Sequence, residues 1–118
     1  MSQAFQAGDF LIFQIESGYG LLKLLAIDGD SGARIWHLRA FNELYADIES
    51  AELGLQDPSA LTVAIEHAAL TDRAFEATQT SRLTAGDLSP DEIEIVEGWR
   101  REMISPSDRS IRLLLGLR

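Results

Sequence analysis

Two histidines, His37 and His67, are the side chains of this sequence best suited to acid–base chemistry near neutral pH. They lie on different expected elements and do not form a paired motif such as H-E-x-x-H. Glu66 directly precedes His67, but in a strand the two side chains point to opposite faces, which disfavours a dyad. A half-buried histidine with a polar partner is the simpler interpretation. The enzymatic alternative is a small hydrolase or lyase that uses His67 with a nearby carboxylate as general base.

The other residue patterns offer no catalytic or cofactor site. The stretch from Asp28 to Gly32 (DGDSG) begins like a calcium loop, but Ala33 stands where the bend needs Gly and Arg39 where a bidentate Glu is required. A hairpin turn fits this stretch better. The glycine-rich stretches do not precede an expected helix, so there is no nucleotide fingerprint, and the absence of cysteine removes thiolate chemistry. We therefore assign no catalytic residue, no metal and no cofactor.

Charge gives the main indication of a partner. The sequence holds 19 Asp and Glu against 10 Lys and Arg, a net charge of −9, which disfavours nucleic acid as a partner. Residues 43–76 contain eight acids and a single basic residue, Arg73, and so carry −7 of that charge. We expect this segment to meet a basic protein partner, although acids of this kind also serve as a solvated surface. The candidate binding residues are Tyr19, at an expected turn tip, and Glu49, Glu52 and Asp57.

The elements that position these residues begin with a meander. Strand-length apolar runs at 9–16 and 21–28 flank a turn with two glycines, and residues 33–41 alternate apolar and polar positions. Residues 46–53 favour a short helix. Residues 57–77 remain open between a continuous helix that starts at Asp57-Pro58 and a strand over 62–69, with the β-branched residues favouring the strand.

The second half contains the clearest local signal. Ser89, Pro90 and Glu92 form a helix-start signature, a Ser cap with Pro at the first position and a Glu that completes a capping box, and predict a helix over 90–104. Trp99 lies in the middle of its apolar arc and should be buried against the sheet. The arc comprises Ile93, Ile95, Val96, Trp99, Met103 and Ile104. Residues 111–117 read as a final apolar strand, and its uncovered face would favour a homodimer.

These elements predict one α+β domain over residues 1–118, a bent antiparallel sheet or small barrel of five strands covered by one main helix. The longest apolar runs are too short to cross a bilayer, and the first residues do not look like a signal peptide, so we expect a cytoplasmic protein.

One resemblance adds to this picture. The opening GDFLIFQI (8–15) followed by GYGLLKLL (18–25) resembles the start of small SH3-like barrels, in which a G-D-x-hydrophobic strand turns at a glycine into a second strand. The same opening is similar to that of bacterial single-domain proteins, including an SH3-like family of toxin-immunity proteins. The resemblance covers about 35 residues and implies an acidic protein-binding module without catalysis. It transfers no functional residue, because it is a fold pattern.

Overall fold

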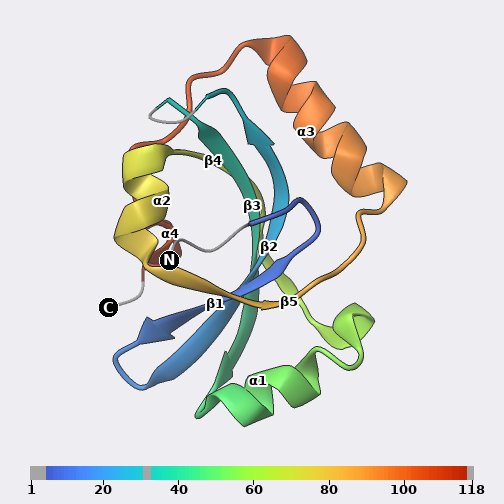
Figure 1. Cartoon of the computed structure of the whole chain (residues 1–118), viewed down its shortest axis with the longest axis vertical. Coiled ribbons are helices and arrows are strands. Elements are labelled where there is room, and N and C mark those ends of the chain that lie inside the picture. The colour runs from blue at the N-terminus through green and yellow to red at the C-terminus, as the bar shows by residue number, and fades with distance from the viewer. Residues whose placement is uncertain (1–4, 31–32, 117–118) are drawn as a thin grey trace.

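The computed structural model describes residues 5–30 and 33–116 of the 118-residue chain. Within these residues, five antiparallel strands form one strongly bent sheet in the spatial order β4-β3-β2-β1-β5, which stays open rather than closing into a barrel (Figure 1). The strands are β1 (Phe10–Ile15), β2 (Gly18–Asp28), β3 (Ile35–Tyr45), β4 (Val63–Thr71) and β5 (Thr80–Thr84). The helices are α1 (Ile48–Gly54), α2 (Asp72–Thr78), α3 (Pro90–Glu102), α4 (Ile111–Leu115) and the short 3-10 helix η1 (Pro58–Ala60). The predicted α+β class with an antiparallel sheet is confirmed.

The predicted meander and the ambiguous middle segment both resolve into strands. β1, β2 and β3 pair in sequence order. Between 57 and 77 the chain forms η1, then β4 beside β3, then α2, so the strand alternative is right and the continuous helix is wrong. The predicted short helix over 46–53 is confirmed as α1, whose N-cap Asp47 accepts a hydrogen bond from the Ser50 backbone N–H at 2.7 Å.

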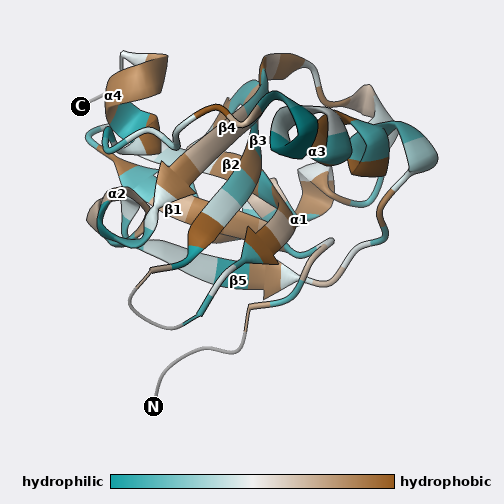
Figure 2. Ribbon diagram, turned by 90° about the horizontal axis from the view of Figure 1, so that it is seen from above, coloured by the Kyte–Doolittle hydropathy of each residue, from teal (hydrophilic) through white to brown (hydrophobic). Residues whose placement is uncertain are grey.

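Alternation along the strands divides the core between the two faces of the sheet. Trp36, Leu38 and Ala40 of β3 face a large core cluster that α2 and α4 cover, and Trp36 stacks on Phe75 of α2 at a ring-centroid distance of 3.9 Å. A smaller apolar cluster on the other face includes Phe10, Ile12, Leu21 and Phe41 of the strands and Ala51 and Leu55 at α1. Figure 2 shows α2 and α4 on one side of the strands and α3 on the other.

Helix α3 begins as the sequence predicted. Ser89 Oγ accepts from the Glu92 N–H, and the Glu92 carboxylate accepts from the Ser89 N–H, so the capping box is complete. The predicted apolar arc is only partly buried. Val96 is buried and Trp99 half-buried, whereas Ile93 and Met103 are exposed, because α3 faces a largely polar strip of the sheet.

One predicted strand is wrong, and one observed strand was not predicted. The predicted strand over 111–117 is the helix α4 up to Leu115, since Ser110 caps its start through the Leu113 N–H and Gly116, at φ 72°, ends it. Residue 117 lies outside the described residues. The fifth strand is β5, a polar segment that the sequence did not mark. Of the helices in residues 5–30 and 33–116, none combines the length and the apolar character needed to cross a membrane.

Candidate functional site

The exposed face of α1 carries two of the predicted binding residues. Glu49 and Glu52 are exposed, and they lie between two exposed apolar side chains, Ile48 and Leu53. Residues three and four apart share one side of a helix, so these four side chains form one patch. The opposite side of the helix is anchored because Ala51 is buried in the smaller core cluster. We call residues 48, 49, 52 and 53 the α1 surface.

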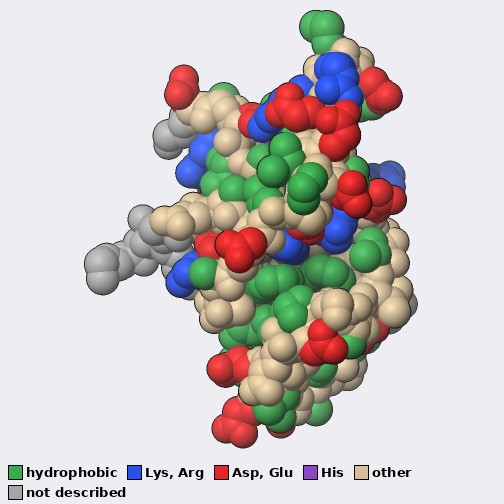
Figure 3. All heavy atoms as spheres, turned by 90° about the vertical axis from the view of Figure 1, so that its right-hand side faces the viewer, with side chains coloured by type: hydrophobic (Ala, Val, Ile, Leu, Met, Phe, Trp, Pro, Cys, Tyr) green, Lys and Arg blue, Asp and Glu red, His purple; other side chains and the backbone are tan. Residues whose placement is uncertain are grey.

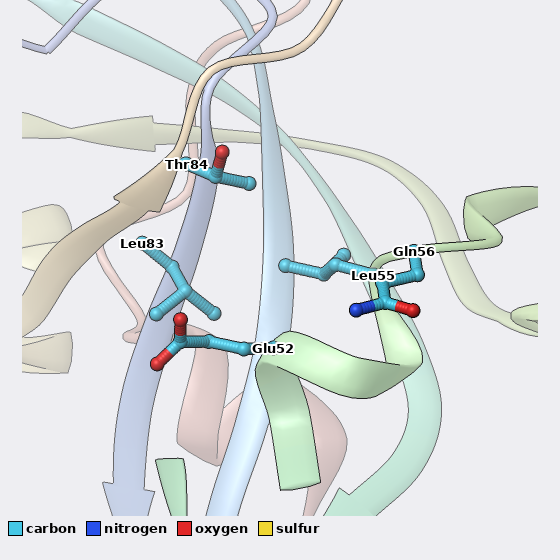
Figure 4. A pocket seen from close by; sticks show the side chains of 5 residues that line it. All are labelled: Glu52, Leu55, Gln56, Leu83 and Thr84. Atoms are coloured by element: carbon cyan, nitrogen blue, oxygen red, sulfur yellow. The ribbon is translucent and has the colours of Figure 1, made fainter. Parts of the chain in front are cut away.

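Two shallow hollows border the α1 surface. One, of about 230 Å³, lies between the end of α1 and the edge strand β5, where Glu52, Leu55 and Leu83 are among the residues that line it (Figure 4). The other, of about 280 Å³, is lined by Glu49, Glu52, Leu53 and Gln56. Glu52 therefore lies between the two hollows, at the centre of the surface that a partner could contact.

The other two predicted binding residues lie near α1 in different settings. Asp57 is exposed at the start of η1, where its carboxylate accepts a hydrogen bond from the Ser59 hydroxyl at 2.5 Å. Tyr19 is not an exposed aromatic at a turn tip. It lies inside β2 opposite Tyr45 and packs, half-buried, against the smaller core cluster under α1.

The acidic segment 43–76 does not form one continuous surface. Glu49, Glu52 and Asp57 are close in sequence at the α1 end, but Glu66 lies on β4 and Glu76 on α2. Asp72 is internally compensated, because it accepts hydrogen bonds from Arg34 at 3.1 Å and from the Trp36 indole at 2.7 Å. The negative charge available to a partner near α1 is therefore smaller in magnitude than the −7 of the whole segment.

The two histidines lie next to each other on the face of the sheet that carries the smaller apolar cluster, beneath α3 rather than α1. His37 Nδ1 lies 2.9 Å from His67 Nε2, and His37 Nε2 lies 2.9 Å from Asp28 Oδ2. Arg100 of α3 holds the same carboxylate, with its Nε 3.0 Å from Oδ2. The Trp99 ring meets the His37 ring edge-on at a centroid distance of 5.0 Å. Asp28, His37 and His67 thus form a hydrogen-bonded row beneath α3.

The hydrogen bonds assign the tautomers of this row. The Asp28 carboxylate only accepts, so His37 donates from Nε2, and in the neutral ring its Nδ1 carries a lone pair. His67 then donates from Nε2 to His37 Nδ1 and keeps its lone pair on Nδ1. Each imidazole is neutral in this arrangement, and the Nδ1 atom of His67 is the position that can take up a proton.

Burial and charge agree with neutral imidazoles. Burial lowers the pKa of His37, against the opposing hydrogen bond to Asp28. Burial together with the neighbouring His37 and Arg39 lowers the pKa of His67 to about 4. The hydrogen bond from Arg100 keeps the pKa of Asp28 below its usual range. At pH 7 the row therefore holds one carboxylate and two uncharged rings.

A second buried polar group lies beside the row. Lys23 of β2 and Arg39 of β3 both pair with the Glu92 carboxylate of α3, at 2.9 and 3.1 Å. Lys23 also donates to the Asp87 carbonyl oxygen at 2.6 Å. Burial works to raise the pKa of Glu92, but hydrogen bonds from the Ser89 backbone and Lys23 hold it below its usual range. We call Lys23, Arg39 and Glu92 the buried triad.

The sequence singled out His67 but missed its partners. The row depends on Asp28, which sequence reasoning placed in a turn that resembles a calcium loop. Residues 31 and 32 of that turn lie outside the described residues. Among the residues that the structure describes, no three His, Asp or Glu side chains are placed to share a metal ion. The alternation of His37 and Arg39 within an apolar strand was the one available signal for a polar strip.

Comparison of the chain with protein-family models, curated proteins and solved structures gave no match. The function must therefore be argued from the geometry.

Proposed function

We propose that this chain is a non-catalytic protein-binding module whose α1 surface meets a basic protein partner. The observation that carries the proposal is the placement of Glu49 and Glu52 between Ile48, 44% exposed, and Leu53, 64% exposed, on one side of an anchored helix. Exposed apolar side chains on either side of the two carboxylates can exclude water from around them, and the carboxylates select a basic partner by charge.

The α1 surface also has the rigidity that recognition favours. Asp47 caps the helix, and Ala51 and Leu55 fix it to the sheet, so little conformational entropy is lost when a partner binds. Asp57 extends the negative charge beyond the end of the helix. The partner should present Lys or Arg around an apolar side chain that fits one of the hollows beside Glu52. Nucleic acid is disfavoured by the same charge.

The experiment is an affinity capture from an extract of the source cell. It compares three baits, the wild-type chain, the Glu49→Lys/Glu52→Lys double variant and Glu76→Lys. Glu76 is an exposed acid on α2, so its reversal, half the charge change of the double variant, is a control on the other face of the sheet. The captured protein is identified, purified and titrated against each bait at 0.1 M and 1 M salt. We expect the double variant to lose at least tenfold in affinity and the control less than twofold.

Salt provides an independent check. The Debye length falls from about 10 Å at 0.1 M to about 3 Å at 1 M, so an electrostatically selected complex weakens with salt. A partner that binds equally to all three baits, or whose affinity does not change with salt, would refute the role of the α1 surface. Recovery of nucleic acid alone would refute the proposed class of partner.

The alternative function, a small hydrolase or lyase, draws on the histidine row. His67 is neutral at pH 7 and is connected through His37 to Asp28, so its Nδ1 atom has the protonation state of a general base. A nucleophile or substrate pocket at that atom would be needed. Hydrolysis of activated esters by the wild-type chain, lost in His67→Gln, would favour the enzyme. Equal rates for the two proteins would exclude it.

Self-association and location belong to the same proposal. Leu113 and Leu114 on α4 are exposed, and a second copy of the chain would cover them, as the predicted homodimer requires. Light scattering at high protein concentration tests this, and a monomer throughout would exclude the dimer. The acidic, cysteine-free sequence fits the predicted cytoplasmic location.

A further inference from the structure

The largest of the hollows described here lies over the buried triad, away from the α1 surface. It has a volume of about 400 Å³, within the range of roughly 300–1,000 Å³ typical of small-molecule sites. Its apolar walls include Phe10, Phe41, Leu61 and Val63, and Lys23, Arg39 and Glu92 also line it. Figure 3 faces this side of the molecule, where blue Lys and Arg side chains lie among green hydrophobic ones.

The charges of the buried triad do not balance. Two cations, Lys23 and Arg39, share the single carboxylate of Glu92, so the formal charge of the group is +1. The three side chains are 5 to 16% exposed, so solvent in the hollow screens the excess charge only in part. Uncompensated charge is costly when buried. An anion in the hollow would offset that cost.

Arg39 has donors available for such an anion. A guanidinium carries five N–H groups. Within the described residues, Arg39 donates from Nε to the Glu66 carbonyl at 3.1 Å and from Nη1 to Glu92 at 3.1 Å. The remaining N–H groups suit a carboxylate, which the planar guanidinium recognises in a bidentate manner.

The walls restrict the rest of the ligand. Phe10 and Phe41 lie 6.3 Å apart between ring centroids, and Leu61 and Val63 add aliphatic surface. A highly charged ligand such as a nucleotide would leave polar groups against these walls without partners. From this geometry we propose that the hollow is a binding site for a small monocarboxylate with an apolar tail, its carboxylate held by Arg39 and its tail packed against the two phenylalanines, Leu61 and Val63.

The test uses octanoate as the probe and octanamide as its uncharged counterpart. Backbone ¹H–¹⁵N NMR shifts are followed during titration of the wild-type chain. We expect octanoate to bind at least tenfold more tightly than octanamide, with the largest shifts at the amides of Phe10, Phe41 and Val63. Equal affinities, binding of neither probe at millimolar concentration, or shifts confined to α1 would overturn the proposal.

Two variants of the buried triad should act in opposite directions. Arg39→Gln removes the recognising charge and should weaken octanoate binding at least tenfold while changing octanamide binding less than twofold. Glu92→Gln raises the formal charge of the triad from +1 to +2 and should tighten octanoate binding several-fold. Gln also serves in a capping box, so α3 should still form. Arg73→Gln, at an exposed arginine on α2, is the matched control.

Opposite directions separate recognition from damage to the fold. A purely structural effect would weaken binding in both variants, and that result would refute the proposal. If Arg39→Gln does not fold, the comparison of octanoate with octanamide and the Glu92→Gln titration still decide the question. The experiment is independent of the α1 surface, so its failure leaves the proposed protein-binding function unaffected.

Discussion

The half-buried His67 makes the stability of the fold depend on pH in a defined direction. Its pKa is about 4 in the folded chain, against an ordinary value of 6.5. When the pH falls below 6.5, His67 takes up a proton in the unfolded chain but stays neutral in the folded chain. The unfolded state is thereby favoured, and the free energy of unfolding declines until the pH reaches about 4.

The two pKa values, 6.5 and about 4, set the size of this effect. Their difference of about 2.5 corresponds to about 3.4 kcal/mol at 1.36 kcal/mol per pKa unit. Because His67 is only half-buried, solvent screens part of the interaction. We therefore expect about 1.5 kcal/mol, all of it present above pH 6.5 and lost at pH 4.

Urea denaturation of the wild-type chain and His67→Gln at pH 7 and pH 4.5 measures this difference. The Gln amide can still donate to His37 Nδ1 but does not titrate, so the variant keeps the hydrogen bond and removes the linkage. The carboxylates and His37 titrate in both proteins, so the difference between the two proteins reports on His67. An equal loss of stability in the two proteins, or a His67 resonance that titrates near pH 6.5 in the folded chain, would refute the reasoning.

Three further predictions test the packing and the backbone. Trp99→Ala should cost about 2 kcal/mol, less than the roughly 3–5 kcal/mol of a fully buried Trp, because the ring is half-buried. A melting temperature equal to that of the wild-type chain would mean that the packing of α3 on the sheet does not contribute to stability. Ser89→Ala removes the helix cap and should cost about 1 kcal/mol by urea denaturation, whereas Ser89→Asp should restore the loss; no recovery would contradict capping as the cause. Gly8→Ala should cost more than about 1 kcal/mol, because φ is +97° and the new Cβ would lie 2.3 Å from a backbone oxygen. Gly98→Ala inside α3 should instead stabilise the protein by about 0.5–1 kcal/mol. Calorimetric shifts in melting temperature of the same sign for both variants would be inconsistent with this backbone argument.

The elements that the sequence predicted correctly are those determined by local chemistry. The start of α3 depends on Ser89, Pro90 and Glu92, which lie next to one another in the chain. Alternation along β3 was also readable, because the buried apolar Trp36, Leu38 and Ala40 alternate with the polar His37 and Arg39. Two short elements were not predicted correctly. α4 and β5 are short, and their form depends on Ser110 and Gly116 and on pairing with β1 rather than on a hydrophobic period.

The candidate sites were harder to predict because their residues meet through the register of the sheet. Lys23 faces Arg39 across β2 and β3, and an irregularity between Leu24 and Ala26 then sets the pairing that follows along the two strands. No local sequence pattern indicates such a shift of register. Arg100 meets Asp28 across 72 residues of sequence. Sequence reasoning could name the histidine but not the carboxylate that completes its row.

The pairing of β5 with β1 has a consequence for how the chain folds during synthesis. Ile15 ends β1 and Thr80 begins β5, so 65 positions separate two neighbouring strands. Hairpins close in microseconds, whereas a ribosome adds about 5–20 residues per second. The β1–β2 hairpin is complete at Asp28, 52 positions before Thr80, so it can form and then wait roughly 3–10 s with the outer edge of β1 unpaired. That edge carries the apolar sequence FLIFQI, a template for misplaced strand pairing. The nascent chain should depend on chaperone protection until β5 emerges from the ribosome.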